Sequence, residues 1–238
     1  MNDQIHPSVI AVWAALIAAV SIIPTVPIAF TGGTFSLASA LIPLAGVFFG
    51  PRKGALCAAI GQIVGQFIAP HTAWLGVPTF IIGTTNAFVA GNVSRRRWAP
   101  AAGVIILGWA LWYTTSIGRQ AAGFPLIYYG LGLIAVFIGS FRGGVWVTSH
   151  NPVVAGIGTW LCAFAGFVGA AAVGNYLGIM LVRIPPKVWN MLVFVSPVER
   201  ALFSLGSAVV GVALMQGLRK MGIPVGPQPD VDGRVGSR

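Results

Sequence analysis

The chain has few acidic residues and few charged residues of any kind. Its four acids are Asp3, Glu199, Asp230 and Asp232, and charged residues make up 8% of its 238 residues. Soluble domains average about 25% charged residues, so this composition excludes an ordinary soluble domain. Hydrophobic residues make up 56% and occur in segments almost to the C-terminus. That distribution indicates a membrane protein with several spans, because a signal peptide would be a single short apolar stretch.

The sequence also lacks the motifs of common catalytic chemistry. Walker A, GxSxG, HExxH and CxxC are absent, and the three histidines are scattered over predicted loops without metal-ligand spacing. Cys57 and Cys162 each lie inside an apolar segment, where a cysteine acts as a small packing residue. Glu199 is the one acid that can lie in the membrane. We therefore expect no enzymatic activity, no metal and no cofactor.

Basic residues give a formal net charge of +10, and their positions predict the topology. A charge of this sign is also typical of nucleic-acid-binding proteins, but basic loop residues that set membrane orientation explain it better. With the N-terminus in the cytoplasm, three basic residues fall outside, at Arg119, Arg183 and Lys187. Ten fall inside: Arg52, Lys53, Arg95, Arg96, Arg97, Arg142, Arg219, Lys220, Arg234 and Arg238. Both termini are therefore predicted to be cytoplasmic, and we expect no nucleic-acid partner.

The predicted fold is an all-α polytopic membrane helical bundle of about eight spans. The apolar segments are 8–29, 36–50, 54–69, 77–93, 99–117, 124–141, 153–182 and 191–217. A span needs about 20 residues, so the second, third and fourth segments are short and need shielding by neighbours. If one of them is re-entrant, the number of spans is seven. Residues 1–221 form one membrane domain in a prokaryotic plasma membrane, and residues 222–238 form a flexible cytoplasmic tail rich in Pro, Gly and charge.

The first 70 residues are the most informative part of the chain. Pro24, Pro27, Gly32, Gly33, Gly50 and Pro51 interrupt three successive apolar segments. Broken segments at membrane depth are tolerated where the backbone lines a cavity or packs on protein, so this pattern indicates transport or binding. Small residues four apart, as in Gly61 and Gly65 or Gly174 and Gly178, predict close packing between helices of the chain.

Polar and aromatic residues concentrate in the predicted outer halves of the helices, as expected for a pocket that opens outward. The candidate substrate-binding residues are Thr34, Gln66, His71, Trp74, Asn86, Trp112, Tyr113, Asn175, Tyr176, Asn190 and Glu199. Gln62 is expected instead to bond across helices, and Trp189 to lie in the interfacial aromatic belt. Glu199 is a ligand contact or a member of a structural ion pair. Arg200 projects about 100° away from it around the helix, so its partner is left open.

Several stretches resemble the substrate-binding S component of energy-coupling factor (ECF) vitamin transporters. The first helix is rich in alanine, the outer loop ends in TGGTFSLASALIP, and LAGVFFGPRKGALCAAIGQIVG joins two short helices through a Gly-Pro turn. PTFIIGTTNAFVAGNVSRRR then closes a short span on arginines, and PPKVWNMLVFVSPVERALFSLGSAVVGVALMQGLRK is similar to the last loop and helix. The family has a core of six helices, so residues 99–142 are interpreted as an added hairpin.

The resemblance implies a mechanism and partners. An S component binds a vitamin or similar micronutrient from outside, docks on a membrane T component that carries two ATPases, and topples to release its substrate inside. Its docking motif on the first helix corresponds here to Ala11 and Ala15, or to Ala14 and Ala18. No resident cofactor is implied.

Two other functions stay open on the sequence alone. A stand-alone secondary transporter would use Glu199 for proton coupling, although one acid and no visible inverted repeat speak against it. A membrane scaffold without a small ligand is the other alternative. The identity of the substrate does not follow from the sequence.

Overall fold

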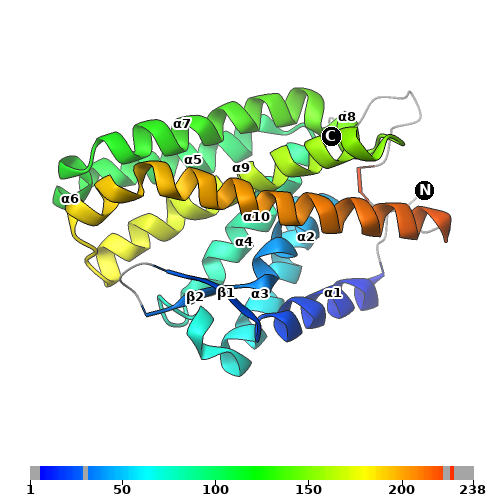
Figure 1. The fold of residues 1–238 in the computed structure, drawn as a ribbon, viewed down its shortest axis with the longest axis horizontal. Helices are drawn as coiled ribbons and strands as arrows, with labels where there is room; N and C mark the ends of the chain where they lie inside the picture. The colour runs from blue at the N-terminus through cyan, green and yellow to red at the C-terminus, as the bar shows by residue number, and fades with distance from the viewer. Residues whose placement is uncertain (1–5, 29–31, 222–225, 228–238) are drawn as a thin grey trace.

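The computed structural model describes residues 6–28, 32–221 and 226–227, and within these ranges the chain is almost entirely helical (Figure 1). The predicted tail therefore lies outside the described residues, apart from 226 and 227. The elements in chain order are α1 (Pro7–Val20), β1 (Pro24–Pro27), β2 (Thr34–Ser36), η1 (Leu37–Ala40), α2 (Ile42–Phe49), α3 (Pro51–Ile68), η2 (Pro70–Thr72), α4 (Thr79–Ser94), α5 (Trp98–Thr114), α6 (Ser116–Gln120), α7 (Gly123–Ile138), η3 (Gly139–Gly143), α8 (Gly144–Val147), α9 (Pro152–Leu181) and α10 (Pro186–Lys220).

Helices α4 and α9 form the centre of the bundle. α4 packs against α9, α3 and α2, while α9 also contacts α10, α5 and α7. Figure 1 shows α1 to α3 on one side of this pair and the α5–α7 hairpin on the other, with α10 running along the length of the molecule. The predicted all-α membrane bundle is confirmed, and 99–142 does fold as two helices joined by the short α6.

The short α2 is enclosed by its neighbours, as its length required, whereas α3 keeps an exposed apolar face that includes Leu56 and Phe67. All eight residues of α2 are buried. Gly50, with φ of 82°, ends α2, and Pro51 begins α3 directly after it. A Cβ on Gly54 would lie 2.5 Å from the carbonyl oxygen of Ala45, so only glycine allows α2 and α3 this approach. Protein contacts thus cover the backbone that would otherwise face lipid.

The first apolar segment differs from its predicted span. The helix predicted over 8–29 ends at Val20, and Pro24–Pro27 pairs antiparallel with Thr34–Ser36 as a two-stranded hairpin. Pro24 and Pro27 cannot continue a helix, because proline lacks the N–H donor and its ring clashes with the preceding turn. Within the described part of the chain, three helical stretches are long and apolar enough to cross a membrane by length and composition: Gly123–Val147, Pro152–Leu181 and Pro186–Lys220.

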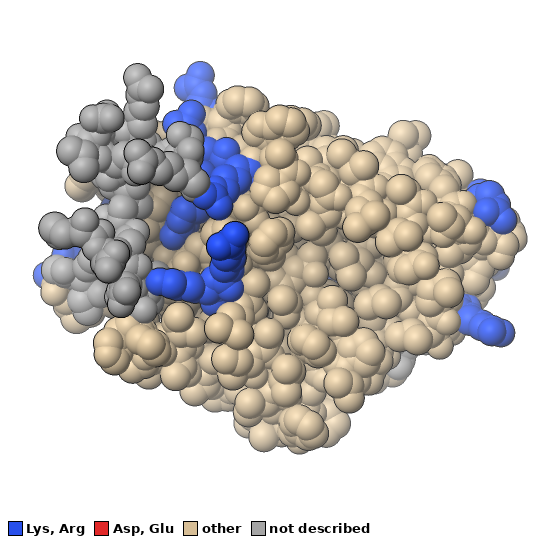
Figure 2. Space-filling view, turned by 180° about the vertical axis from the view of Figure 1, so that it is seen from behind, with Lys and Arg blue, Asp and Glu red and all other residues tan. Residues whose placement is uncertain are grey.

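Basic side chains gather at the two ends of the molecule. On the face in Figure 2 they flank a broad belt that carries no charged side chain. α1 begins and α10 ends at the same end of the bundle (Figure 1), which we call the basic end. There Arg95 folds inward, and its guanidinium donates to the carbonyl oxygens of Val47 at 3.0 Å and Phe48 at 3.3 Å. Arg95 therefore caps the C-terminus of the short α2.

Candidate functional site

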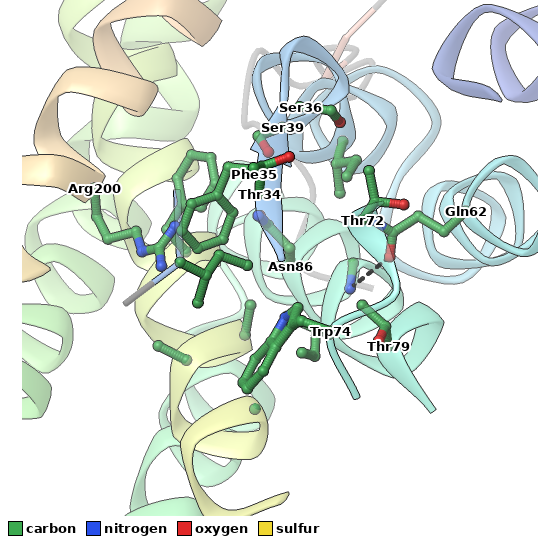
Figure 3. Close-up of a pocket in the computed structure, with 18 of the residues that line it drawn as sticks. Thr34, Phe35, Ser36, Ser39, Gln62, Thr72, Trp74, Thr79, Asn86 and Arg200 are labelled. Carbon is green, nitrogen blue, oxygen red and sulfur yellow. Dashed lines mark hydrogen bonds between the residues drawn. The ribbon is translucent and has the colours of Figure 1, made fainter. Parts of the chain in front are cut away.

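An inner cavity of about 90 Å³ lies beneath the β1–β2 hairpin, away from the basic end (Figure 3). Side chains from β2, α3, α4, α9 and α10 converge on it. Its polar lining residues are Thr34, Ser36, Ser39, Gln62, Thr72, Thr79, Asn86, Asn175 and Arg200. The aromatic part of its wall comes from Phe35, Trp74 and Phe167. Among the described residues of this wall, Arg200 is the only charged one, so they present mainly neutral hydrogen-bonding groups to the cavity.

A larger outer cleft of about 630 Å³ adjoins the inner cavity. β1, residues 184–202 and the ring of Trp74 form its walls, which are mainly apolar. The two spaces share five lining residues: Ile28, Phe35, Trp74, Asn175 and Arg200. Drug-sized ligands occupy pockets of about 300–1,000 Å³. The inner cavity alone is too small for such a ligand, whereas the two spaces together are large enough.

Arg200 stands at the junction of the two spaces. Its guanidinium lies over the ring of Phe35, 4.1 Å from the centroid, and its Nη2 is 3.8 Å from Oε2 of Glu199. The side chains are about one-sixth and one-fifth exposed, at 15% for Arg200 and 21% for Glu199. An isolated charge is costly at membrane depth, so the pairing lowers the cost of burying both groups. Glu199 thus lies within ion-pair distance of Arg200, which supports the ion-pair alternative, and it also lines the cleft, so a ligand contact at Glu199 stays a prediction.

The polar groups around the inner cavity fall into two classes. Gln62 Oε1 accepts from the backbone N–H of Gly83 at 3.1 Å, and the Thr79 hydroxyl donates to the carbonyl of Gly76 at 2.8 Å. These groups are already committed to the protein, and the prediction that Gln62 bonds across helices is confirmed. Thr34 Oγ1 and Asn86 Oδ1 are buried without a hydrogen-bond partner among the described residues. A buried polar atom without a partner costs about 1–3 kcal/mol, so these two atoms are suited to a bound ligand.

Five of the predicted site residues line the two spaces. Thr34, Trp74, Asn86 and Asn175 line the inner cavity, and Glu199 lines the outer cleft. They come from β2, the loop after η2, α4, α9 and α10, and the helix packing brings them together.

The other six predicted site residues line neither space. Gln66 and His71 lie at the end of α3 and in η2, each with a buried Nε2 that has no partner in the described structure. Tyr176 lines a different groove, of about 270 Å³, between α4, α5 and α9. Asn190 is exposed on α10. The sequence predicted how deep each residue lies in the membrane, but not the direction around the helix axis in which its side chain points.

Trp112 and Tyr113 are hydrogen-bonded within the hairpin instead. Trp112 is fully buried, and its indole N–H donates to the carbonyl of Gly118 at 2.9 Å. The Tyr113 hydroxyl donates to the carbonyl of Ala122 at 2.9 Å. Trp189, expected in the interfacial belt, is also buried and packs edge-on against Trp112, with ring centroids 5.0 Å apart.

Sequence reasoning did not include several residues of the inner wall. Phe35, Ser36 and Ser39 follow Thr34 directly in the loop that was expected at the mouth of the pocket, so their position in the sequence was a usable signal. Arg200 was noted only as the neighbour of Glu199. Its role at the junction depends on contact with Phe35, which is distant in sequence.

The alanines of α1 divide between its two faces. Ala14 and Ala18 are buried, with exposed fractions of 3% and 4%, against α3. A Cβ on Gly61 would lie 2.8 Å from the carbonyl oxygen of Ala14, so the Gly61 and Gly65 pair serves packing within the chain, as predicted. Ala11 and Ala15 are exposed. Of the two predicted docking pairs, Ala14 and Ala18 are thus inaccessible to a partner, and Ala11 and Ala15 stay a prediction.

Comparison with known proteins identifies the family. The model of the family described as ECF-type riboflavin transporter, S component, matches residues 4–127, just over half of the chain. The chain belongs to this family. The match to the S-component family runs from α1 into the start of α7, so it includes part of the hairpin that the sequence suggested was an addition. Of the 19 described residues that line the inner cavity, the 13 from Ile28 to Asn86 lie within the matched part of the chain.

A second comparison adds a distant relative. This S component is 24% identical over 148 residues to an uncharacterized protein of Methanocaldococcus jannaschii. The alignment covers 62% of this chain and 49% of the relative, so the chain spans about half the length of the curated relative it matches. No solved structure matches the chain.

Proposed function

We propose that this chain is the substrate-binding subunit of an ECF-type importer and that it holds a vitamin in the inner cavity and outer cleft. The observation that carries the proposal is the polar inner cavity, whose unpartnered Thr34 Oγ1 and Asn86 Oδ1 lie within the matched part of the chain. Riboflavin is the first candidate, because the description of the matched family names it. A vitamin of this size would extend from the inner cavity into the cleft.

The energy for transport comes from partners in this proposal. A T component and two ATPases bind the S component and drive release of the vitamin on the inner side. Ala11 and Ala15 form the candidate contact with the T component, since their small exposed side chains let a helix of the partner approach closely. The substrate enters from the end opposite the basic end, in agreement with the orientation that the basic residues predict.

Riboflavin titration of the purified protein tests the proposal. Binding beside Trp74 should quench riboflavin fluorescence, and riboflavin at 100 times its Kd should stabilise the protein by about 2.7 kcal/mol. Liposomes that contain the chain alone should not accumulate riboflavin. Sustained concentrative uptake by the chain alone would contradict the proposal, and so would the absence of any retained or added vitamin ligand.

The proton-coupled alternative finds little support in the site. Glu199 is the sole acid among the residues that the structure describes, and it lies within ion-pair distance of Arg200. Uptake that collapses with the proton gradient and in Glu199→Gln would favour that alternative.

A further inference from the structure

Asn175 occupies a special position in the site, because its side chain lines both the inner cavity and the outer cleft. Its amide nitrogen Nδ2 donates to the hydroxyl oxygen of Tyr129, 46 residues earlier in the chain, at 3.3 Å. A side-chain amide carries two donors on nitrogen and an acceptor on oxygen, and the bond it makes fixes which of them are left for a ligand. With one N–H of Nδ2 donated to Tyr129, the amide is fixed in orientation, and its carbonyl oxygen Oδ1 and its second N–H are left for a ligand.

Tyr129 is itself held firmly in place. It is fully buried on α7, in the centre of the hairpin's aromatic cluster. Its ring lies 5.7–6.4 Å, centroid to centroid, from the rings of Trp109, Trp112, Phe124 and Tyr128. Aromatic pairs at these separations and inclined angles are favourable, so the Tyr129 hydroxyl has a fixed position. The same cluster supports the outer cleft, since Trp112 and Phe124 both contact Trp189, which lines the cleft.

The geometry points to Tyr129 as a positioning residue for ligand binding, through which the α5–α7 hairpin orients the Asn175 amide toward the two spaces. Tyr129 lines neither space, so it acts only through Asn175. The inference rests on the proposed function of the site. It assigns the hairpin a part in recognition and predicts that the ligand presents a donor to Oδ1 of Asn175 or an acceptor to its second N–H.

A double-mutant cycle in the full-length protein tests this role. The variants are Tyr129→Phe, Asn175→Ala and the two combined, with riboflavin as the probe and mass spectrometry of the small molecule retained on purification as a second readout. Tyr129→Phe keeps the ring and its packing, so the thermal midpoint without ligand should change little. Binding should weaken by about two- to tenfold, the range that one neutral hydrogen bond gives. In the Asn175→Ala background, Tyr129→Phe should have no further effect.

Tyr113→Phe is the matched control. It also removes a hydrogen-bonded hydroxyl from the hairpin, but its partner is the carbonyl of Ala122 and not a residue of the site. It should bind riboflavin and retain ligand as the unmodified protein does. Equal binding by Tyr129→Phe and the unmodified protein would overturn the inference alone. The same loss in both backgrounds would also overturn it, because that result indicates a general structural effect. Absence of riboflavin binding and of any retained ligand in the unmodified protein would overturn the proposed function and this inference with it.

Discussion

Replacing Asn86 with leucine should stabilise the ligand-free protein or leave it unchanged, while it abolishes ligand binding. Asn86 is 3% exposed, and its Oδ1 has no hydrogen-bond partner in the described part of the chain. Such an atom costs about 1–3 kcal/mol, and a leucine, which has the same branched shape but a larger volume, removes that cost. In the unmodified protein, a ligand that donates a hydrogen bond to Oδ1 would offset this cost. Asn86 is therefore expected to destabilise the folded protein when no ligand is bound.

Asn92 on the same helix provides the control. It is as buried as Asn86, at 2%, but its Nδ2 donates to the carbonyl of Phe88 at 2.9 Å, and it lines neither space. Both Asn→Leu changes add the same apolar surface, so the difference between their free energies of unfolding isolates the contribution of hydrogen bonding. Asn92→Leu should be less stable than Asn86→Leu by about 1–3 kcal/mol. For a chain of this size that corresponds to about 2–4 °C in the thermal midpoint for each kcal/mol.

Thermal unfolding in detergent, with and without riboflavin, measures both quantities. Asn86→Leu should lose the shift that riboflavin causes, and Asn92→Leu should keep it. Thr34→Val, which removes the other unpartnered oxygen with almost no change of shape, should behave like Asn86→Leu. If Asn86→Leu proved less stable than Asn92→Leu and kept its riboflavin shift, the reasoning from unpartnered polar atoms would be refuted.

Two further predictions concern the basic end and α1. Ala15→Trp should fold and bind riboflavin but fail to co-purify with the T component and ATPases, and its normal assembly would contradict the docking proposal. Ala14→Trp should instead lower the thermal midpoint, because overpacking typically costs about 1–3 kcal/mol. Arg95→Met should lower the free energy of unfolding by about 1.5–3 kcal/mol through loss of the bonds to Val47 and Phe48, with riboflavin affinity unchanged. An unaltered denaturation midpoint in Arg95→Met would show that the cap is dispensable.

The positions of most helices followed closely from the sequence, because the hydrophobic segments and the Gly and Pro residues between them determine helix positions locally. The short helices were anticipated from Gly50 and Pro51, and close helix packing from Gly61 and Gly65, although the sequence did not show that α1 is the helix that packs there. The β1–β2 hairpin was missed for a physical reason. Residues 21–29 are as apolar as the helix before them, and hydropathy does not distinguish a strand from a helix in such a short run.

The site was harder to predict than the fold, since a helix carries its polar residues on any face. Asn175 and Tyr176 are neighbours at the same depth, yet one lines both spaces and the other faces a separate groove. Trp112 has the depth and chemistry expected of a ligand contact but lies behind the wall, against Trp189. The side that each helix turns to the centre depends on contacts between distant segments. A single sequence taken alone does not specify these contacts.

Two glycines of α9 explain why Asn86, a residue of the inner cavity, is held rigidly. A Cβ on Gly169 would lie 2.7 Å from a methyl carbon of Val89, and a Cβ on Gly166 would overlap Oδ1 of Asn86. α9 can therefore approach α4 closely at these two positions, and the contact clamps Asn86 between the helices. The spacing is slightly wider at Gly174, where a Cβ would lie 3.0 Å from the δ-methyl carbon of Ile82, and both Gly174 and Asn175 line the inner cavity. A binding residue fixed by backbone contact on two central helices is held more precisely than one on a loop. The position of Asn86 should thus depend on this helix contact and not on the β1–β2 hairpin.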